Sequence, residues 1–253
     1  MTEPKVYLSH GGGVNSWALY LWLIEQGQVP GKDFEAVFIH HGCDWPETYR
    51  YLLLMESLGY PVTVIFPWRH GHWNLYDYCK DKKMFPSRQR RWCTDHFKLQ
   101  ASLSYYQRPS VVMTGFDAGE EGRMERQQMF EDDGITHDYP LIAEGIDRQG
   151  CIDLIQHHGL PVPPKSGCYI CPFQGRADFL KLREQKPELF CKAKTLETLC
   201  SEKRIALGKP PTYFRDMPLE DLIQAKDYRG RRAAVGQTEM FDSHDRPPCR
   251  CGL

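Results

Sequence analysis

Cysteines at short spacings are the residues of this chain best suited to metal chemistry. Cys168 and Cys171 form a Cys-x2-Cys pair followed by proline, within SGCYICPF. Such a turn places two thiolates on one ion or cluster, and two more thiolates complete a tetrahedral zinc site or a [4Fe–4S] cluster. Further candidates are Cys93, in RRWCTDHFK, and Cys249 and Cys251, in the terminal RPPCRCGL. We interpret these five as candidate cluster ligands, with zinc as the alternative.

The remaining cysteines fall in other contexts. Cys79, Cys151, Cys191 and Cys200 lie in segments with helical character, so we expect them to be core residues. Cys43 lies in a loop, where it could be a reactive thiol. We expect an intracellular chain, and in a reducing compartment cysteines are seldom paired in disulfides.

A glycine-rich turn stands near the beginning of the chain, in LSHGGGVNSWALYLWL (8–23). Gly11, Gly12 and Gly13 permit positive φ and close backbone approach. Asn15 and Ser16 could cap the following helix and donate to phosphate oxygens. Between a strand and a helix, such a turn lets backbone N–H groups converge on an anion. It matches neither GxGxxG nor GxxxxGK[ST], so a phosphate site and a simple turn both stay open.

Two later loops have polar residues in comparable positions. HHGCDWPETYRYL (40–52) places His40 and Gly42 where a second strand is expected to end. TGFDAGEEGRM (114–124) offers Gly115 followed by acidic and basic side chains, which are Asp117, Glu120, Glu121 and Arg123. Acidic groups at a phosphate site often hold Mg²⁺, and an arginine can neutralise a transferring group. A polar surface loop is the alternative.

Short apolar runs alternate with amphipathic ones through the first half. Strands are expected at 5–9, 34–40, 62–68 and 110–116, and helices at 14–25, 47–59 and 94–106. This alternation predicts an α/β fold, a Rossmann-like open parallel sheet with helices on both faces. All three polar loops then follow strands, at the ligand-facing edge of the sheet.

The pattern changes after residue 134. We expect a short helix at 151–160, a long helical segment at 179–204 and an irregular tail over the last 45 residues. The predicted organisation is a nucleotide-binding α/β domain over 1–145. A cysteine-rich helical and irregular C-terminal region, 146–253, packs on it.

Composition limits the partners. The 253 residues carry 32 basic and 33 acidic side chains, for a net charge of −1, so nucleic-acid binding would depend on local patches. Candidates are Arg88, Arg90 and Arg91 with nearby Lys98, the lysines at 80, 82 and 83, and RGRR (229–232), and a solvated surface is the alternative. Without an apolar run of membrane length or a signal peptide, a cytoplasmic protein is expected.

In this order the motifs resemble the phosphoadenosine phosphosulfate (PAPS) reductase family of the PP-loop ATP pyrophosphatase (adenine nucleotide alpha hydrolase-like) superfamily. GGGVNS (11–16) looks like the SGGxDS loop, HHGCDWPET (40–48) like DTGxxxPET, and TGFDAGEEGR (114–123) like the TGxRxxES-R region. YPLIAEGIDRQGCIDLIQHHGLPVPP (139–164) is similar to the passage before the family's last cysteine pair. The resemblance is closest to phage and bacterial members that carry iron–sulfur clusters, and it implies an adenine-nucleotide site.

The departures from the family pattern concern carboxylates and the tail. Gly11 and Asn15 replace Ser and Asp, and His40 stands where Asp is usual, so the bound nucleotide stays open. CRCGL resembles the ECG[LI]H tail of sulfonucleotide reductases, whose cysteine attacks sulfur, but lacks its Glu and His. In the cluster-bearing relatives a terminal cysteine is instead a plausible ligand, and we prefer that role for Cys249 or Cys251.

The leading hypothesis is an enzyme that uses ATP and Mg²⁺ to adenylylate a substrate and then delivers sulfur at a [4Fe–4S] cluster. Asp117, Glu121, Arg123 and Cys251 are its candidate catalytic residues. A nucleobase in tRNA or DNA is the expected acceptor, and a cysteine desulfurase a possible sulfur donor. The alternatives are an APS or PAPS reductase with Cys251 as nucleophile, and a non-catalytic nucleotide-binding scaffold with structural zinc.

Overall fold

A single parallel sheet organises the chain. The computed structural model describes residues 3–88, 91–128 and 134–225. Its strands are β1 (Lys5–Ser9), β2 (Glu35–Ile39), β3 (Thr63–Ile65), β4 (Ser110–Thr114) and β5 (Ile135–Asp138). They run in the order β3-β2-β1-β4-β5, every neighbouring pair parallel. The predicted Rossmann-like α/β class is confirmed, and β1 and β4 lie side by side where the strand order reverses.

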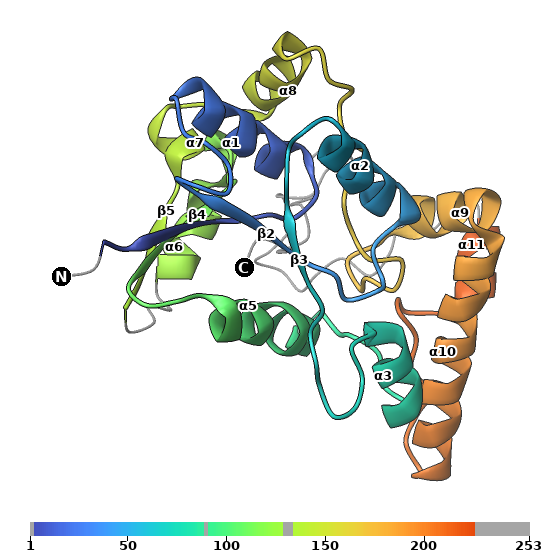
Figure 1. The fold of residues 1–253 in the computed structure, drawn as a ribbon. Coiled ribbons are helices and arrows are strands. Elements are labelled where there is room, and N and C mark those ends of the chain that lie inside the picture. Colours follow the sequence, from blue (N-terminus) through green and yellow to red (C-terminus); the bar gives the residue numbers. More distant parts are fainter. Residues whose placement is uncertain (1–2, 89–90, 129–133, 226–253) are drawn as a thin grey trace.

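Helices cover both faces of this sheet (Figure 1). Because successive strand residues point to opposite faces, neighbouring side chains enter different cores. Leu8 packs in a core with α1 (Val14–Glu25), α2 (Pro46–Ser57) and α8 (Arg148–His157). Tyr7, the preceding residue, packs in a second core against α5 (Gln100–Tyr105).

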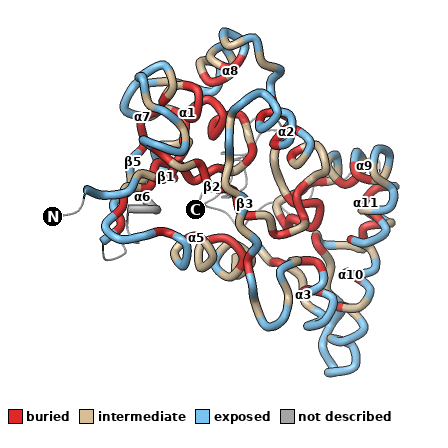
Figure 2. Tube along the Cα trace, viewed as in Figure 1, coloured by how far each residue is buried: buried red, intermediate tan, exposed pale blue. Residues whose placement is uncertain are grey.

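A third core lies beside the sheet and contains the C-terminal helices. It combines α9 (Arg176–Gln185), α10 (Pro187–Ala206) and α11 (Leu219–Gln224) with α3 (Leu75–Lys82). Cys168, Cys171 and Cys43 are buried in the same core. Figure 2 shows buried residues in this region as well as in the sheet. The Cys-x2-Cys turn therefore lies between the sheet and the helices that follow it.

Short helices complete the described chain. They are α4 (Trp92–Thr94), the π-helix η1 (Asp95–Leu99), the 3₁₀ turn η2 (Ala118–Glu120), α6 (Glu121–Gln128) and α7 (Pro140–Ala143). Among the described helices, none combines the length and apolarity needed to cross a membrane.

Several expected elements differ from the structure. The helical segment 179–204 is two helices, because Pro187 cannot continue α9 and instead begins α10. The third strand ends at Ile65, before Pro67. The strand β5 and the helix α6 were not predicted, and α11 lies in the tail expected to be irregular. Cys191 is exposed, so its prediction as a core residue is wrong, whereas Cys79, Cys151 and Cys200 are buried.

The predicted boundary at residue 145 falls just before α8. That helix packs against α1, and its Cys151 and Ile155 belong to the sheet core. The two-domain division remains a prediction.

Candidate functional site

The glycine turn and the loop after β4 lie against each other. A Cβ on Gly115 would stand 2.7 Å from the carbonyl oxygen of Asn15, so only glycine fits this approach. Gly12 has φ +72°, and a Cβ there would lie 2.6 Å from Thr48 Cγ2 of α2. A Cβ on Gly13 would lie 2.7 Å from Ser166 Oγ. The turn is thus enclosed by α2, by the loop after β4 and by the segment before the cysteine pair.

Asn15 joins these loops through its side-chain amide. Its Nδ2 donates to Asp117 Oδ2 (2.9 Å) and to Glu120 Oε2 (3.1 Å), and its Oδ1 accepts from Arg148 Nη1 (2.5 Å). The N-cap of α1 is Gly13, without a side-chain cap, and Ser16 Oγ donates to the Gly13 carbonyl (2.9 Å). The prediction that Asn15 and Ser16 cap α1 is therefore wrong, because both side chains are used elsewhere.

In the acidic cluster at 117–121, two of the three carboxylates are paired with other groups of the protein. Asp117 accepts from the Gly119 N–H (3.0 Å) as well as from Asn15. Glu120 forms an ion pair with Arg123, whose guanidinium lies 4.3 Å from the Phe116 ring centroid. Burial raises the pKa of Glu120, against the lowering effect of Arg123. Glu121, a predicted catalytic residue, is exposed.

The side chain of His10 is hydrogen-bonded to the backbone of the glycine turn, a role that we did not predict. Its Nδ1 accepts from the Gly12 N–H (3.2 Å), and its ring packs edge-on against Trp17 at 4.3 Å between centroids. Complete burial lowers the pKa of His10 to about 3. A neutral imidazole is therefore part of the turn at ordinary pH.

His40 and Gly42, in the loop after β2, face aromatic neighbours. The His40 ring stacks on Tyr49 at 4.2 Å and on Phe66 at 5.0 Å between centroids. Gly42 has φ +75°, and a Cβ there would lie 3.2 Å from a ring atom of Trp73. This loop therefore connects the sheet edge to the segment that follows β3.

The same loop is joined to the cysteine pair by backbone bonds. Trp45 donates to the Gly167 carbonyl (3.0 Å), Tyr169 donates to the Cys43 carbonyl (2.9 Å), and Asp44 forms an isolated antiparallel bridge with Cys168. The Cys-x2-Cys turn is consequently fixed to the end of β2.

His41, Asp44 and Cys168 form a buried polar group at this junction. The His41 Nε2 lies 3.4 Å from Cys168 Sγ and 3.4 Å from Asp44 Oδ2, a spacing that could hold a metal ion. His41 Nδ1 accepts from the Cys43 N–H (3.2 Å), which places the proton of the neutral ring on Nε2. A metal-bound imidazole normally donates from its other nitrogen, so His41 is better suited to donate a hydrogen bond to the sulfur.

Three of the predicted ligand cysteines line one small pocket. Cys93, Cys168 and Cys171 share it with His41 and Lys98, and none of the three forms a disulfide. Lys98 is only 9% exposed, so it faces this pocket and not the outer surface. The Arg88 and Arg91 guanidinium groups lie 5.6 and 5.2 Å from the Phe173 ring centroid. Arg90, Cys249 and Cys251 lie outside the described residues.

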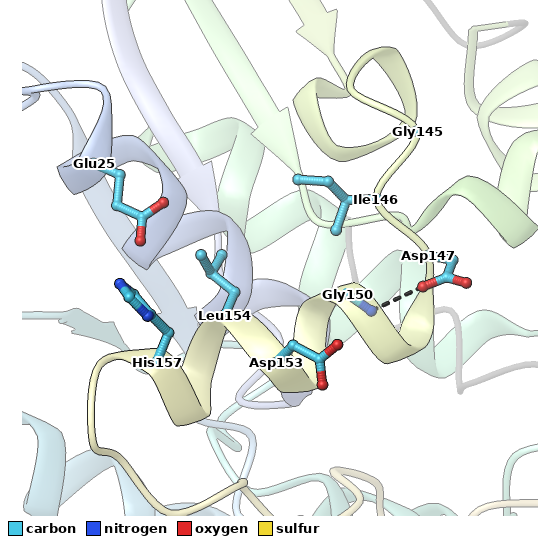
Figure 3. Close-up of a pocket in the computed structure, with 8 residues that line it drawn as sticks. All are labelled: Glu25, Gly145, Ile146, Asp147, Gly150, Asp153, Leu154 and His157. Carbon is cyan, nitrogen blue, oxygen red and sulfur yellow. Dashed lines mark hydrogen bonds between the residues drawn. The ribbon is translucent and has the colours of Figure 1, made fainter.

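A larger hollow lies elsewhere, between the end of α1 and α8 (Figure 3). Asp147 accepts from the Gly150 N–H (2.8 Å) and caps α8, and Asp153 accepts from Gln149 Nε2 (2.7 Å). His158, just after α8, lies 3.0 Å from Glu25 of α1. Polar groups here join two helices, and none of the predicted site residues lines this hollow.

Comparison with known proteins gives partial matches. No protein-family model matches the chain. An uncharacterized nin region protein, ORF290, of Escherichia phage lambda is 41% identical over 59 residues, 23% of this chain and 20% of that protein. The uncharacterized protein MJ0973 of Methanocaldococcus jannaschii is 25% identical over 173 residues, 63% of this chain and 40% of that protein. The matches thus span less than half of each relative's length.

Among solved structures, the chain is similar to the U34-tRNA thiolase NcsA from Methanococcus maripaludis, described with its [4Fe–4S] cluster. The TM-score is 0.42 and the identity 14%, over 79% of this chain and 72% of that one. At this level of similarity the thiolase activity does not transfer to this chain.

Proposed function

We propose that this chain is a PAPS-reductase-like enzyme of the PP-loop type, which activates a substrate with an adenine nucleotide and transfers sulfur at an iron–sulfur cluster. The observation that carries the proposal is a junction at the sheet's carboxyl edge. There the loop after β2 is hydrogen-bonded to the Cys-x2-Cys turn, and Ser166, just before that turn, packs on the glycine turn. A nucleotide and a thiol-ligated group could thus occupy adjacent positions.

The nucleotide part of the proposal uses the N-terminus of α1. The first N–H groups of a helix have no acceptor within it and carry partial positive charge, so they favour a phosphate. Gly11, Gly12 and Gly13 would let phosphates approach the backbone, with Ser16, His40, Gly42 and Gly115 around the nucleotide. Asn15 would act indirectly, by fixing the loop that holds Asp117. Mg²⁺ would bind near Asp117 and Glu121, and Arg123 would offset phosphate charge.

The cysteine pocket fits a cluster by its donor set. Three cysteines outside any disulfide line it, and the His41 Nε2–H can donate to Cys168 Sγ. Cys93, Cys168 and Cys171 would hold three irons, and Cys249 or Cys251 would complete the set. When bound, a [4Fe–4S] cluster would supply one iron site for sulfur, open where the fourth cysteine is displaced from its iron. Lys98, buried beside the thiols, would place a positive charge near the reacting sulfur.

A metal assay tests the cluster. Anaerobically purified wild type should contain about four irons and four sulfides per chain, and Cys93→Ser, Cys168→Ser and Cys171→Ser should each lose most of both. Cys191→Ser, which changes an exposed cysteine, is the matched control and should retain them. One zinc without iron or sulfide would replace the cluster with the zinc-scaffold alternative.

Product assays test the activity and its main competitor. The proposal predicts pyrophosphate release from ATP with a tRNA or DNA acceptor and a sulfur donor such as a cysteine desulfurase. The competing reductase would release sulfite from APS or PAPS, and Cys251→Ser would abolish that release while leaving the iron content unchanged. Neither product, despite an intact cluster, would leave a nucleotide-binding protein without this chemistry.

A further inference from the structure

An aromatic segment follows β3, and none of the roles above uses it. Residues 66–73, FPWRHGHW, contain three large aromatic side chains and no acidic one. We call this segment the aromatic loop. Phe66 is 55% exposed, Trp68 72% and Trp73 38%. It lies between β3 and α3 (Figures 1 and 2). Large rings exposed together in a short segment usually mark a binding surface.

The backbone of the aromatic loop is held in a defined shape. Arg69 and His72 exchange two backbone hydrogen bonds, of 2.8 and 2.9 Å, across His70 and Gly71, both at positive φ. Arg69 Nη1 also donates to Gln100 Oε1 of α5 (2.8 Å). Exposed aromatic rings on an ordered turn can bind a ligand with a small loss of conformational entropy.

Nearly parallel aromatic rings are stacked at this surface. Tyr49, His40 and Phe66 form a column, with interplanar angles of 11° between the first two and 27° between the last two. Trp73 meets Phe66 edge-on, at 82° and 5.3 Å. Phe66 ends this column within the described residues and is more than half exposed, so another flat ring can extend it.

The aromatic loop borders the cysteine pocket. Trp73 packs over Gly42. The Leu75 N–H, just beyond the loop, donates to the His41 carbonyl (2.9 Å), and both Leu75 and His41 line the pocket with Cys168. A molecule with a flat ring stacked on Phe66 would thus lie beside the loop after β2, whose His41 lines the cysteine pocket.

We propose that the aromatic loop binds an unpaired nucleobase of a single-stranded nucleic acid. Flat bases stack on aromatic side chains irrespective of sequence, and neighbouring phosphates favour a basic residue such as Arg69. The inference deepens the proposed function by giving the acceptor a structural class, but binding at this surface needs neither ATP nor a cluster.

The test is binding of a fluorescently labelled single-stranded RNA, without ATP, measured by anisotropy. Phe66→Ala and Trp68→Ala should each weaken binding about tenfold, and RNA should quench tryptophan fluorescence less in Trp68→Ala than in the wild type. Ile205→Ala, which removes a 59% exposed side chain from α10, is the control and should change affinity less than twofold. Circular dichroism verifies that all variants fold.

Four results would overturn the inference. Equal affinities of wild type, Phe66→Ala and Trp68→Ala would remove the aromatic loop from the nucleic-acid surface. Displacement of the RNA by millimolar AMP would assign the column to the adenine of the nucleotide. Self-association abolished by Trp68→Ala, without RNA binding, would assign it to a second copy of the chain. Wild-type protein that binds no RNA, although it has an intact cluster and releases pyrophosphate, would reject this inference alone. Wild-type protein that binds RNA through the aromatic loop but has no cluster and releases no pyrophosphate would reject the proposed function alone.

Discussion

Asn15 is the residue through which the glycine turn and the loop after β4 are held in register. Its amide nitrogen serves the two carboxylates of Asp117 and Glu120, and its oxygen accepts from Arg148. A single side chain thus satisfies groups from two segments, the loop after β4 and the beginning of α8. The charge balance of the site depends on this residue being an amide.

Asn15→Asp tests that dependence. The change replaces a donor by a third carboxylate, so Asp117 and Glu120 lose a hydrogen bond and gain a repulsive neighbour. We expect the free energy of unfolding to fall by about 1–3 kcal/mol, measured by urea denaturation at pH 7. A variant as stable as the wild type would show that Arg148 compensates the added charge. Asn15→Ala separates the two effects, because it removes the donor without adding charge.

His10 makes stability depend on pH. Its folded pKa, about 3, lies below the ordinary value of 6.5, so between these values the unfolded chain binds a proton that the folded chain does not. Unfolding free energy therefore falls as pH drops through this window. His10→Asn keeps an acceptor for the Gly12 N–H but does not titrate.

Between pH 7 and pH 5 we expect the His10→Asn variant to lose roughly 2 kcal/mol less unfolding free energy than the wild type does. Urea denaturation at the two pH values measures the difference. His41, whose pKa burial lowers to about 4, remains in the variant, so some pH dependence persists. Parallel losses in both proteins would mean that His10 is hydrated in the folded state.

At the residue scale, local pattern could identify the three polar loops but not their internal bonds. The partners of Asn15 stand 102, 105 and 133 positions away. A spacing rule along the chain does not reach that far, which is why capping was the wrong role for Asn15. His41 was hidden for another reason, since the adjacent His40 occupies the position that the family pattern points to.

At the scale of elements, close backbone approach is the condition that joins the loop after β4 to α1. Gly115 meets the Asn15 carbonyl and the Ser16 Cα, at 2.7 and 3.0 Å from a built Cβ, and neither atom can rotate away. Gly122, a few residues later in α6, has no heavy atom within 4 Å of its built Cβ. Gly122 therefore serves as the control position for a substitution at Gly115.

Gly115→Ala should destabilise the protein by about 1–3 kcal/mol and weaken ATP binding, because the added methyl separates the loop from α1. Gly122→Ala should stabilise it by about 0.5–1 kcal/mol, the difference in helix propensity, with ATP binding unchanged. Thermal denaturation and isothermal titration calorimetry measure both quantities. Equal effects of the two substitutions would contradict the close approach.

The boundaries of helices and strands were predictable where the hydrophobic pattern and the positions of glycine and proline agree. The helix at Val14–Glu25 has the predicted bounds, because an apolar run follows the glycine turn directly. The strand β5, ITHD, holds a single large apolar residue and depends on pairing with β4. The break between α9 and α10 was visible in Pro187, but the amphipathic pattern on both sides masked it.

At the scale of the molecule, the glycine turn and the Cys-x2-Cys turn pack against different hydrophobic cores. The glycine turn is part of the sheet core, whereas the Cys-x2-Cys turn is buried with α9, α10 and α11. Composition alone could not reveal this, because both cores draw on residues from distant parts of the chain.

Removal of the proposed metal group should therefore loosen one core only. In hydrogen–deuterium exchange, apo protein should exchange faster over residues 41–45 and 167–182, where backbone bonds tie the thiol turn to the sheet. Strands β1 and β4 should keep their protection, because they pair across the sheet core. Uniformly faster exchange over all segments would indicate one cooperative unit instead.

Ser166 fills the space that a side chain at position 13 would need, and it stands two residues before Cys168. One hydroxymethyl group thus separates the turn proposed for phosphate from the turn proposed for sulfur chemistry. Close-packed atoms leave no slack, so a displacement of either turn is passed to the other. The consequence concerns order in time: whichever turn is occupied first sets the shape that the second ligand meets.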